Sequence, residues 1–365
     1  MSLAGSVRRM TMAAILVVSA EIMMPIALAA ERAPLTEVEA LYAELAKLPA
    51  EERAKRIEDG ARREGRLSFI HSWRGQLGRR HVQLFEKRYP FIKIEVTDIG
   101  SQDAAERLLA EETAGRHLTD IVSLAVGDMG DIVDLVAHYP TPATERIFDR
   151  YKAFIDPQNR WVPFYWTEHG LSYNSAMLPP DKAPKSWEDL CKPEYKGQIS
   201  FEPLETRFLI GLYTMMGEQR LESWLKCIGQ NKPIIQRGHT QRLQLMLAGD
   251  HAIQGDNYLY QGMLLKAKDP NVPFAPVFGA PSPANAGVVV INKHAAHPYA
   301  AALLADWTLS QESQEYTAKE YRGPVAAKHP YMPDEAKIVV FGMADADVTD
   351  RLQTYWNRYI GIGAK

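Results

Sequence analysis

The fold is decided by RLSFI at residues 66–70, FIKIEV at 91–96 and DIVSLA at 120–125. Each is a short apolar or alternating run of the kind that forms a β-strand. Helical patterns over 78–89 and 104–114 separate them. Because strands that alternate with helices of this length build a parallel, doubly wound sheet, the sequence predicts the α/β class.

Polar and aromatic residues follow the predicted strands. His71, Trp73 and Arg74 come after the first strand, and Ser101 and Gln102 come after the second. The carboxyl ends of parallel strands meet at one edge of a sheet, where ligands of such folds bind. We therefore expect these residues to lie in or beside a binding site.

Length and composition narrow the class of protein. The chain has 365 residues, which suits two lobes better than one core. Hydrophobic residues make up 46% and charged residues 24%, as in a folded globular protein. A net charge of −3 provides no basic excess for a phosphate backbone, so no nucleic-acid partner is expected.

The N-terminus has the pattern of an export signal. Arg8 and Arg9 precede an apolar run, and Ala27-Leu28-Ala29 forms a small-residue cleavage site. We predict a signal peptide over residues 1–29, cleaved near Ala29. Glu21 interrupts the apolar run, which argues against a permanent membrane anchor. An exported chain meets an oxidising compartment, so the two cysteines, Cys191 and Cys227, either form a disulfide or remain two buried thiols.

Residues 31–64 predict a helical hairpin ahead of the first strand. Thr36 and Glu39 form a capping box, and apolar residues then recur at helical spacing. Pro49 separates the first helix from a second, highly charged one. The hairpin either packs on the main body or docks a partner.

Five segments occur in an order that resembles bacterial extracellular solute-binding proteins, the ligand-capturing subunits of ABC importers. They are FEKRYPFIKIEV at 85–96, LSYNSAML at 171–178, PKSWEDL at 184–190 with YKG at 195–197, LAGDHAI at 247–253, and AGV at 286–288 with HPYAAALL at 297–304. Together they place the resemblance over residues 66–325. The hairpin departs from the family core, which usually begins at the first strand.

The resemblance implies a two-lobed periplasmic-binding-protein fold of type II, in which each lobe is a mostly parallel sheet flanked by helices. Hinge strands join the lobes, and the solute lies in the cleft between them. The expected lobes are 65–140 with 284–323, and 141–283 with 324–365. The resemblance also implies a periplasmic location and, as partners, an ABC permease, an ATPase and a small solute. It implies no required cofactor.

Within that class the chain resembles the group that binds ferric iron. Ferric iron is a hard cation that prefers charged oxygen ligands and also accepts imidazole. Tyr258 matches a tyrosine that these proteins use as a metal ligand, and Tyr260 lies one residue beyond the position of their second. Tyr173 and His71 match positions that some members use. The resemblance thus implies Fe3+, or a ferric chelate, as transported ligand, although Tyr258 could instead only line the cleft.

A small anion is the competing ligand. Ser101, the pair Thr206 and Arg207, and the pair Arg237 and Thr240 come just before predicted helices. Helix N-termini bind anions, and an arginine adds a two-pronged contact for phosphate or carboxylate. A phosphonate, a sugar phosphate or a carboxylate therefore remains an alternative, and acidic cleft residues would instead favour a polyamine.

Two different classes of function remain open beside solute binding. An exported hydrolase is one, but the chain contains no G-x-S-x-G, H-E-x-x-H or S-x-x-K set of motifs. His294 and His297 have the spacing of one helix face and could hold a metal, yet a surface role is the simpler interpretation. A ligand-sensing partner of a receptor is the other class, with the hairpin as its docking element.

Overall fold

The strand–helix alternation that begins at residue 66 forms the larger of two β-sheets in the computed structural model of the chain. The structure describes residues 34–203 and 205–361, so the predicted signal peptide lies outside the described residues. The described residues from Leu35 onward group into one compact unit. In the described part, no helix combines the length and apolar character that crossing a bilayer requires.

The larger sheet has the strand order β11-β4-β10-β3-β1-β2, and β12 pairs with β10. Its strands are β1 (Arg66–His71), β2 (Lys93–Asp98), β3 (Ile121–Ala125), β4 (Val162–Glu168), β10 (Ser282–Ile291), β11 (Gly323–Pro324) and β12 (Ile338–Phe341). β1 is parallel to β2 and β3, as predicted, whereas β10 is antiparallel to β3 and β4.

The smaller sheet has the order β7-β6-β8-β5-β9. Its strands are β5 (Gly170–Asn174), β6 (Ile199–Phe201), β7 (Ile234–Ile235), β8 (Ile253–Asn257) and β9 (Phe274–Pro276). β6 is parallel to its neighbours, and β5 is antiparallel to β8 and β9. Both sheets are therefore mixed, not mostly parallel as expected, because β10 runs against β3 and β4 in the larger sheet and β5 runs against β8 and β9 in the smaller one.

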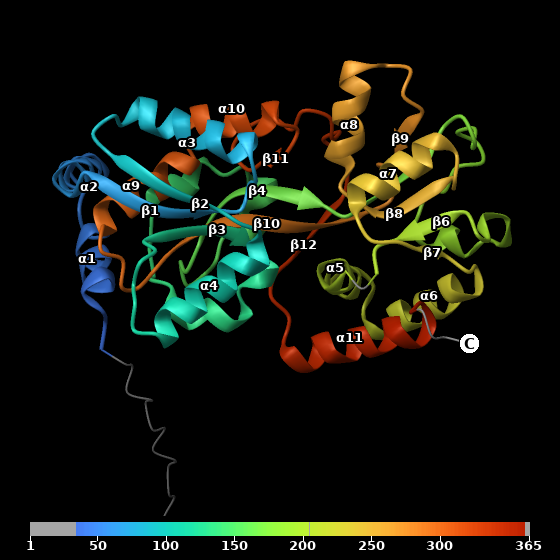
Figure 1. Ribbon diagram of the computed structural model, residues 1–365, viewed down its shortest axis with the longest axis horizontal. Coiled ribbons are helices and arrows are strands. Elements are labelled where there is room, and N and C mark those ends of the chain that lie inside the picture. Colours follow the sequence, from blue (N-terminus) through green and yellow to red (C-terminus); the bar gives the residue numbers. More distant parts are fainter. Residues whose placement is uncertain (1–33, 204, 362–365) are drawn as a thin grey trace, which may run out of the picture. The chain divides into compact units, whose positions relative to one another are not determined.

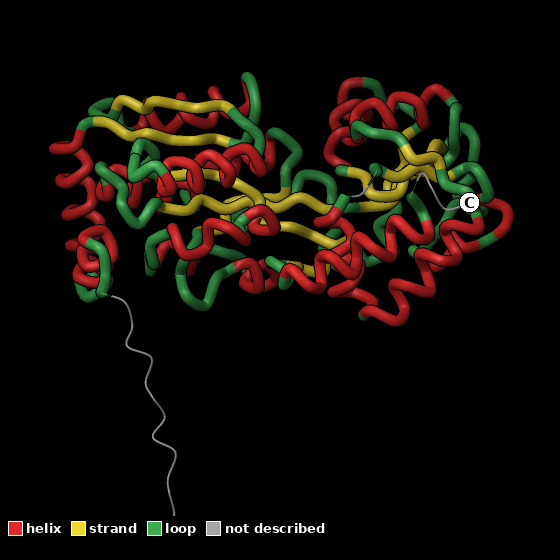
Figure 2. The backbone as a smooth tube through the Cα atoms, turned by 60° about the horizontal axis from the view of Figure 1, so that its bottom comes forward, coloured by secondary structure: helices red, strands yellow, loops and turns green. Residues whose placement is uncertain are grey.

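Helices cover both sheets. They are α1 (Glu37–Leu45), α2 (Ala50–Glu64), α3 (Gln76–Arg88), α4 (Ser101–Thr113), α5 (Thr206–Met216), α6 (Glu218–Gln230), α7 (His239–Ala248), α8 (Leu259–Lys268), α9 (Pro298–Thr308), α10 (Gln311–Lys319) and α11 (Ala346–Tyr359). α3 and α10 lie on one side of the larger sheet and α4 on the other (Figure 1). Figure 2 shows the two groups of strands, each surrounded by helices.

The chain first crosses between the sheets at His169, the single residue between β4 and β5. The expected lobe boundary at residue 140 lies earlier, in a segment whose side chains join the core of the larger sheet. The chain returns between β9 and β10, and the C-terminal α11 packs with α5 and α6 on the second core. The segment between residue 140 and β4 thus belongs to the larger-sheet half of the molecule.

β10 forms the centre of the larger sheet, and all ten of its residues are buried. A run of valines and an isoleucine gives it the apolar character of a strand covered on both faces. Gly287 allows the ring of Tyr165 to lie directly against the backbone, since a Cβ there would be 1.7 Å from a ring carbon. This close approach fixes β4 against β10 at the start of the hinge.

The predicted hairpin forms and packs on the larger-sheet core. Thr36 and Glu39 make the capping box, and apolar residues of α1 and α2 join that core. Arg53 is only 4% exposed and pairs with Asp306 at 2.9 Å, while its other terminal nitrogen donates to Tyr139 at 2.6 Å. The hairpin is therefore anchored by a buried charge as well as by apolar contact.

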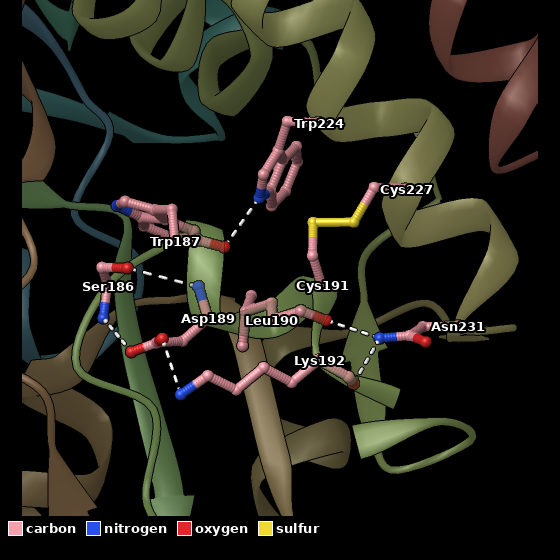
Figure 3. The surroundings of a disulfide bond; sticks show 9 residues. All are labelled: Ser186, Trp187, Asp189, Leu190, Cys191, Lys192, Trp224, Cys227 and Asn231. Carbon is pink, nitrogen blue, oxygen red and sulfur yellow. Dashed lines mark hydrogen bonds and ion pairs between the residues drawn. A yellow bond between two sulfur atoms is a disulfide. The ribbon is translucent and has the colours of Figure 1, made fainter. Parts of the chain in front are cut away.

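Cys191 and Cys227 form a disulfide with a Cα–Cα distance of 5.6 Å (Figure 3). It joins the short helical turn before β6 to α6. The side-chain amide of Asn231 donates to the carbonyls of Leu190 and Lys192 next to it. Of the two alternatives left open by the sequence, the structure has the disulfide.

Candidate functional site

A cavity of about 950 Å³ is lined by residues from the larger-sheet half and from the smaller-sheet half of the molecule. The larger-sheet side contributes the segment after β1, the start of α4 and the segment after β3. The other side contributes the start of α5 and part of α11. The predicted residues that line it are Arg74, Ser101, Gln102, Thr206 and Arg207. We call this cavity the interlobe pocket.

Arg207 spans the interlobe pocket. Its Nη1 lies 3.6 Å from a carboxylate oxygen of Asp128, which follows β3, and its Nε donates to Glu205 at 2.9 Å. The proximity of Tyr258, Glu205 and Asp128 raises the pKa of Arg207, so its guanidinium is charged at any physiological pH. One fixed cation thus connects the two halves of the pocket.

Ser101 fixes Asp128 in place. The Ser101 hydroxyl accepts the backbone N–H of Ala125 at 2.7 Å and donates to the Asp128 carboxylate. Its role is therefore to join the end of β3 to the start of α4. Neither Gly100 nor Glu205, which precede α4 and α5, gives its helix a side-chain cap. Both helices begin at the pocket with uncapped N-termini, which favours anionic groups there.

Tyr258 lies beside Arg207, at the junction of β8 and α8. Its ring centroid is 4.4 Å from that of His239, 5.1 Å from that of His169 and 6.1 Å from that of Tyr260. Burial raises the pKa of Tyr258, and the charge of Arg207 only partly opposes the shift. The phenol of Tyr258 therefore keeps its proton unless a bound cation stabilises the phenolate.

A buried network supports the Tyr258 segment. Nδ1 of His169 lies 2.7 Å from a carboxylate oxygen of Asp256, within hydrogen-bonding distance, and both side chains are 1% exposed. Arg242 donates to the backbone carbonyl of Asp256 at 2.9 Å. The backbone of Asp256 has φ = 53°, a strained value for a residue other than glycine. A strained backbone of this kind persists only where the surrounding contacts determine its conformation, as the contacts of His169 and Arg242 do at the end of β8.

Arg322 forms a second contact between the two halves. Its guanidinium carbon lies 5.0 Å from the ring centroid of Trp73, 5.6 Å from that of Tyr165 and 4.9 Å from that of Tyr260. Tyr260 belongs to α8 beside the smaller sheet, whereas Trp73 and Tyr165 belong to the larger-sheet half. Through these cation–π contacts, Arg322 connects Tyr260 of one half to Trp73 and Tyr165 of the other.

Several buried polar atoms near these residues lack partners among the described residues. Both amide atoms of Asn285 are unpaired, as are Nε of Arg322 and Nε1 of Trp73. A Cβ on Gly127 would lie 3.1 Å from the Asn285 amide and 3.2 Å from Cγ of Arg207, so these side chains are close together. Buried polar groups are normally paired, so bound water or a solute is expected to complete the hydrogen bonds of these atoms.

The remaining predicted residues lie elsewhere. His71 is 1% exposed, with Nδ1 2.9 Å from Ser123 and Nε2 3.3 Å from His81. Both ring nitrogens are thus engaged, which corrects its prediction as a metal ligand. Tyr173 is 8% exposed in the smaller-sheet core. Arg237 and Thr240 are exposed and are not among the residues that line the pocket. Helix α7 begins earlier than predicted, at His239, so Thr240 lies in its first turn.

Sequence reasoning missed Asn285, Arg322, Glu205 and His239. One signal was present for Asn285, a polar residue at the start of an otherwise apolar strand. The others lie in segments without a periodic pattern. Their proximity depends on how the two halves meet.

The family model for bacterial extracellular solute-binding proteins matches residues 134–347. The chain belongs to this family. As a solute-binding protein it binds a small solute and is not an enzyme, which confirms the predicted class. None of the curated proteins matches the chain.

Solved structures show the fold of this solute-binding protein. Iron-bound HitA from Pseudomonas aeruginosa superposes with a TM-score of 0.67 at 15% identity, covering 79% of this chain and 98% of HitA. AfuA from Actinobacillus pleuropneumoniae, with exogenous fructose-6-phosphate bound, gives 0.61 at 20%, covering 82% and 100%. FutA from Trichodesmium, with iron and citrate, gives 0.64 at 15%, covering 81% and 99%. The predicted two-lobed, type II fold is confirmed.

Proposed function

We propose that this protein is the exported receptor of an ABC importer, which captures its solute in the interlobe pocket and delivers it to a permease driven by an ATPase. The observation that carries the proposal is Arg207, which contacts Asp128 of one half and Glu205 of the other inside the pocket. A solute bound there would hold the halves together. The predicted signal peptide and the family support a periplasmic location.

We propose a ferric chelate as the solute. Tyr258 and Tyr260 are not among the residues that line the interlobe pocket, but Tyr258 lies beside Arg207, which does. The two neighbouring phenols suit a hard cation once deprotonated. A bare Fe3+ ion would meet the guanidinium of Arg207, whereas a chelate brings anionic groups that pair with it. HitA with iron and FutA with iron and citrate are consistent with this choice.

A phosphate-bearing anion without iron is the second candidate. It is favoured by the uncapped starts of α4 and α5 at the pocket and by Arg207. AfuA with fructose-6-phosphate is a neighbour of this kind. A polyamine is the third candidate. Asp103, Asp128 and Glu205 already pair with arginines, but Glu106, Asp131 and Asp350 also line the pocket, and no ion pair engages them among the described residues.

The first two candidate solutes can be distinguished by visible absorption, because iron bound to a phenolate absorbs visible light and an iron-free anion does not. Iron-free mature protein is mixed separately with ferric citrate, citrate, fructose-6-phosphate and a polyamine, and visible absorption and melting temperature are recorded. A solute at 100 times its Kd adds about 2.7 kcal/mol of stability, which a thermal shift detects. We expect ferric citrate alone to give both a phenolate–iron band and a higher melting temperature.

Variants assign the result to the pocket. Tyr258→Phe removes only a hydroxyl and should weaken and shift the band, because Tyr260 alone then provides a phenolate, whereas the matched change Tyr173→Phe should leave the band intact. Arg207→Lys should weaken binding of either solute, because lysine lacks the two-pronged contact. Stabilisation by fructose-6-phosphate without colour would establish the second candidate. If no solute, polyamines included, raises the melting temperature, the pocket assignment is wrong.

A further inference from the structure

Two imidazoles and a carboxylate meet outside the interlobe pocket. Glu112 lies in the last turn of α4, His117 in the loop between α4 and β3, and His294 in the loop between β10 and α9. One ligand atom from each lies within 4.8 Å of the others. The group therefore joins segments that are far apart in the sequence.

The carboxylate of Glu112 faces both rings. One oxygen lies 3.3 Å from Nδ1 of His117, and the other lies 3.9 Å from Nε2 of His294. The two imidazole centroids are 4.4 Å apart. Within residues 34–203 and 205–361, no other side chain forms a hydrogen bond or ion pair with either ring. Both rings are thus free to bind a ligand.

Buried contacts hold the two histidine loops together. The side-chain amide of Asn292 donates to the carbonyl of Thr119 at 3.1 Å, and its oxygen accepts the backbone N–H of His294 at 2.9 Å. Thr119 in turn donates through its N–H and its hydroxyl to Glu111, the neighbour of Glu112. The backbones that carry the three candidate ligands are therefore already in place.

The donor set suits a divalent transition metal ion. Zn2+ binds imidazole nitrogen and carboxylate oxygen at about 2.0–2.1 Å in a tetrahedron, which puts neighbouring ligand atoms about 3.3 Å apart. With one ligand atom taken from each residue, all separations are within 4.8 Å, so the three side chains need to move together slightly to reach that spacing. The side chains are 28–37% exposed, which leaves a fourth position for water. Mg2+ and Ca2+ prefer oxygen ligands throughout.

The pair of histidines singled out in the sequence does not form this site. Nδ1 of His297 instead pairs with the buried Asp120 at 2.8 Å. His294 and His297 therefore have different partners, although they are only three residues apart in the sequence. Its partners come from the α4–β3 segment.

We propose that Glu112, His117 and His294 bind one Zn2+ ion, with water as the fourth ligand. The ion would join α4 to the loop before α9 and would be independent of solute binding in the interlobe pocket. No electron transfer or covalent step is involved, since Zn2+ has no redox chemistry here.

Equilibrium dialysis of metal-free mature protein against Zn2+ tests the site, with a preparation that carries no histidine tag. We expect one bound equivalent. His117→Ala, His294→Ala and Glu112→Gln should each weaken binding by at least about tenfold, since even outer contacts of a metal site cost that much. The matched control His138→Ala, at an exposed histidine, should bind as the wild type does.

Co2+ provides a measurement that does not depend on variants. A strong visible band typical of four-coordinate Co2+ is expected in the wild type, and added Zn2+ should remove it. Wild-type protein that binds no Zn2+, or folded His117→Ala and His294→Ala variants that bind it unchanged, would overturn the proposal. A weak six-coordinate Co2+ spectrum would do the same.

Discussion

Glu168 offers a test of the buried hinge. It is the last residue of β4, directly before the crossing at His169, and is 1% exposed. Its carboxyl group accepts a hydrogen bond from the hydroxyl of Tyr331 at 2.7 Å. Burial raises the pKa of Glu168 from 4.5 to about 7, although that hydrogen bond and the charge of Arg322 oppose the shift.

The sign of the effect follows from linkage. Below pH 4.5 the carboxyl is protonated in both the folded and the unfolded chain, so it adds no pH dependence. As the pH rises from 4.5 to about 7, the unfolded chain releases the proton and the folded chain retains it. Folding is therefore progressively disfavoured across this window, and the full cost is present above it. A pKa shift of this size lowers the free energy of unfolding by about 3 kcal/mol once the pH is above the window.

Glu168→Gln removes the titration and keeps an oxygen that can accept from Tyr331. We expect the variant to be more stable than the wild type by up to about 3 kcal/mol at pH 8 and to differ little from it at pH 4.5. Urea unfolding of solute-free protein, with the disulfide intact, measures both values. Buried histidines such as His81 also make stability depend on pH, but they are common to both proteins and cancel in the difference.

Glu335→Gln, at an exposed glutamate, is the control and should show no comparable change with pH. A stability difference between Glu168→Gln and wild type that is the same at pH 4.5 and pH 8 would refute the reasoning. So would a variant that is less stable at pH 8. Either result would mean that the carboxyl group is hydrated or stabilised as an anion in the folded protein.

Three further changes test the packing of the fold. Arg53→Ala should lower the free energy of unfolding by about 3–5 kcal/mol in urea melts, because it leaves buried partners without their cation, while Arg56→Ala at an exposed arginine should cost far less. Reduction of Cys191–Cys227, which are separated by 36 residues, should cost about 4 kcal/mol, seen as a lower urea midpoint with reductant. Gly287→Ala should reduce soluble yield and melting temperature, because its methyl group would overlap the ring of Tyr165; an unchanged melting temperature would show that the ring moves aside freely.

Local patterns were enough to predict most of the first half of the larger sheet. The strands predicted at 66–70 and 120–125 and the capping box at Thr36 and Glu39 form as expected, and the strand predicted at 91–96 forms two residues later, over Lys93–Asp98. These features depend on periodicity and on hydrogen bonds between near neighbours, which the sequence contains directly. The same patterns could not show that β4 joins the larger sheet, because that pairing brings Tyr165 beside Gly287, more than a hundred residues away.

The candidate site was predictable only in part. Arg74, Ser101, Gln102, Thr206 and Arg207 reach the interlobe pocket because strand ends and helix starts determine their places. His71 points into the core, where His81 and Ser123 bind its ring nitrogens. Strand position alone does not reveal which side chains will be buried.

By itself, the sequence determined the α/β class, the hairpin and the strand ends at which a solute site could form, since each arises from interactions within a few residues. Only the tertiary structure decided that Arg207 would meet Asp128, that Asn285 would lie buried and unpaired, and that His294 would join His117 instead of His297. Such contacts join segments distant in the chain, and their energies depend on burial and on atomic distances that periodicity does not encode.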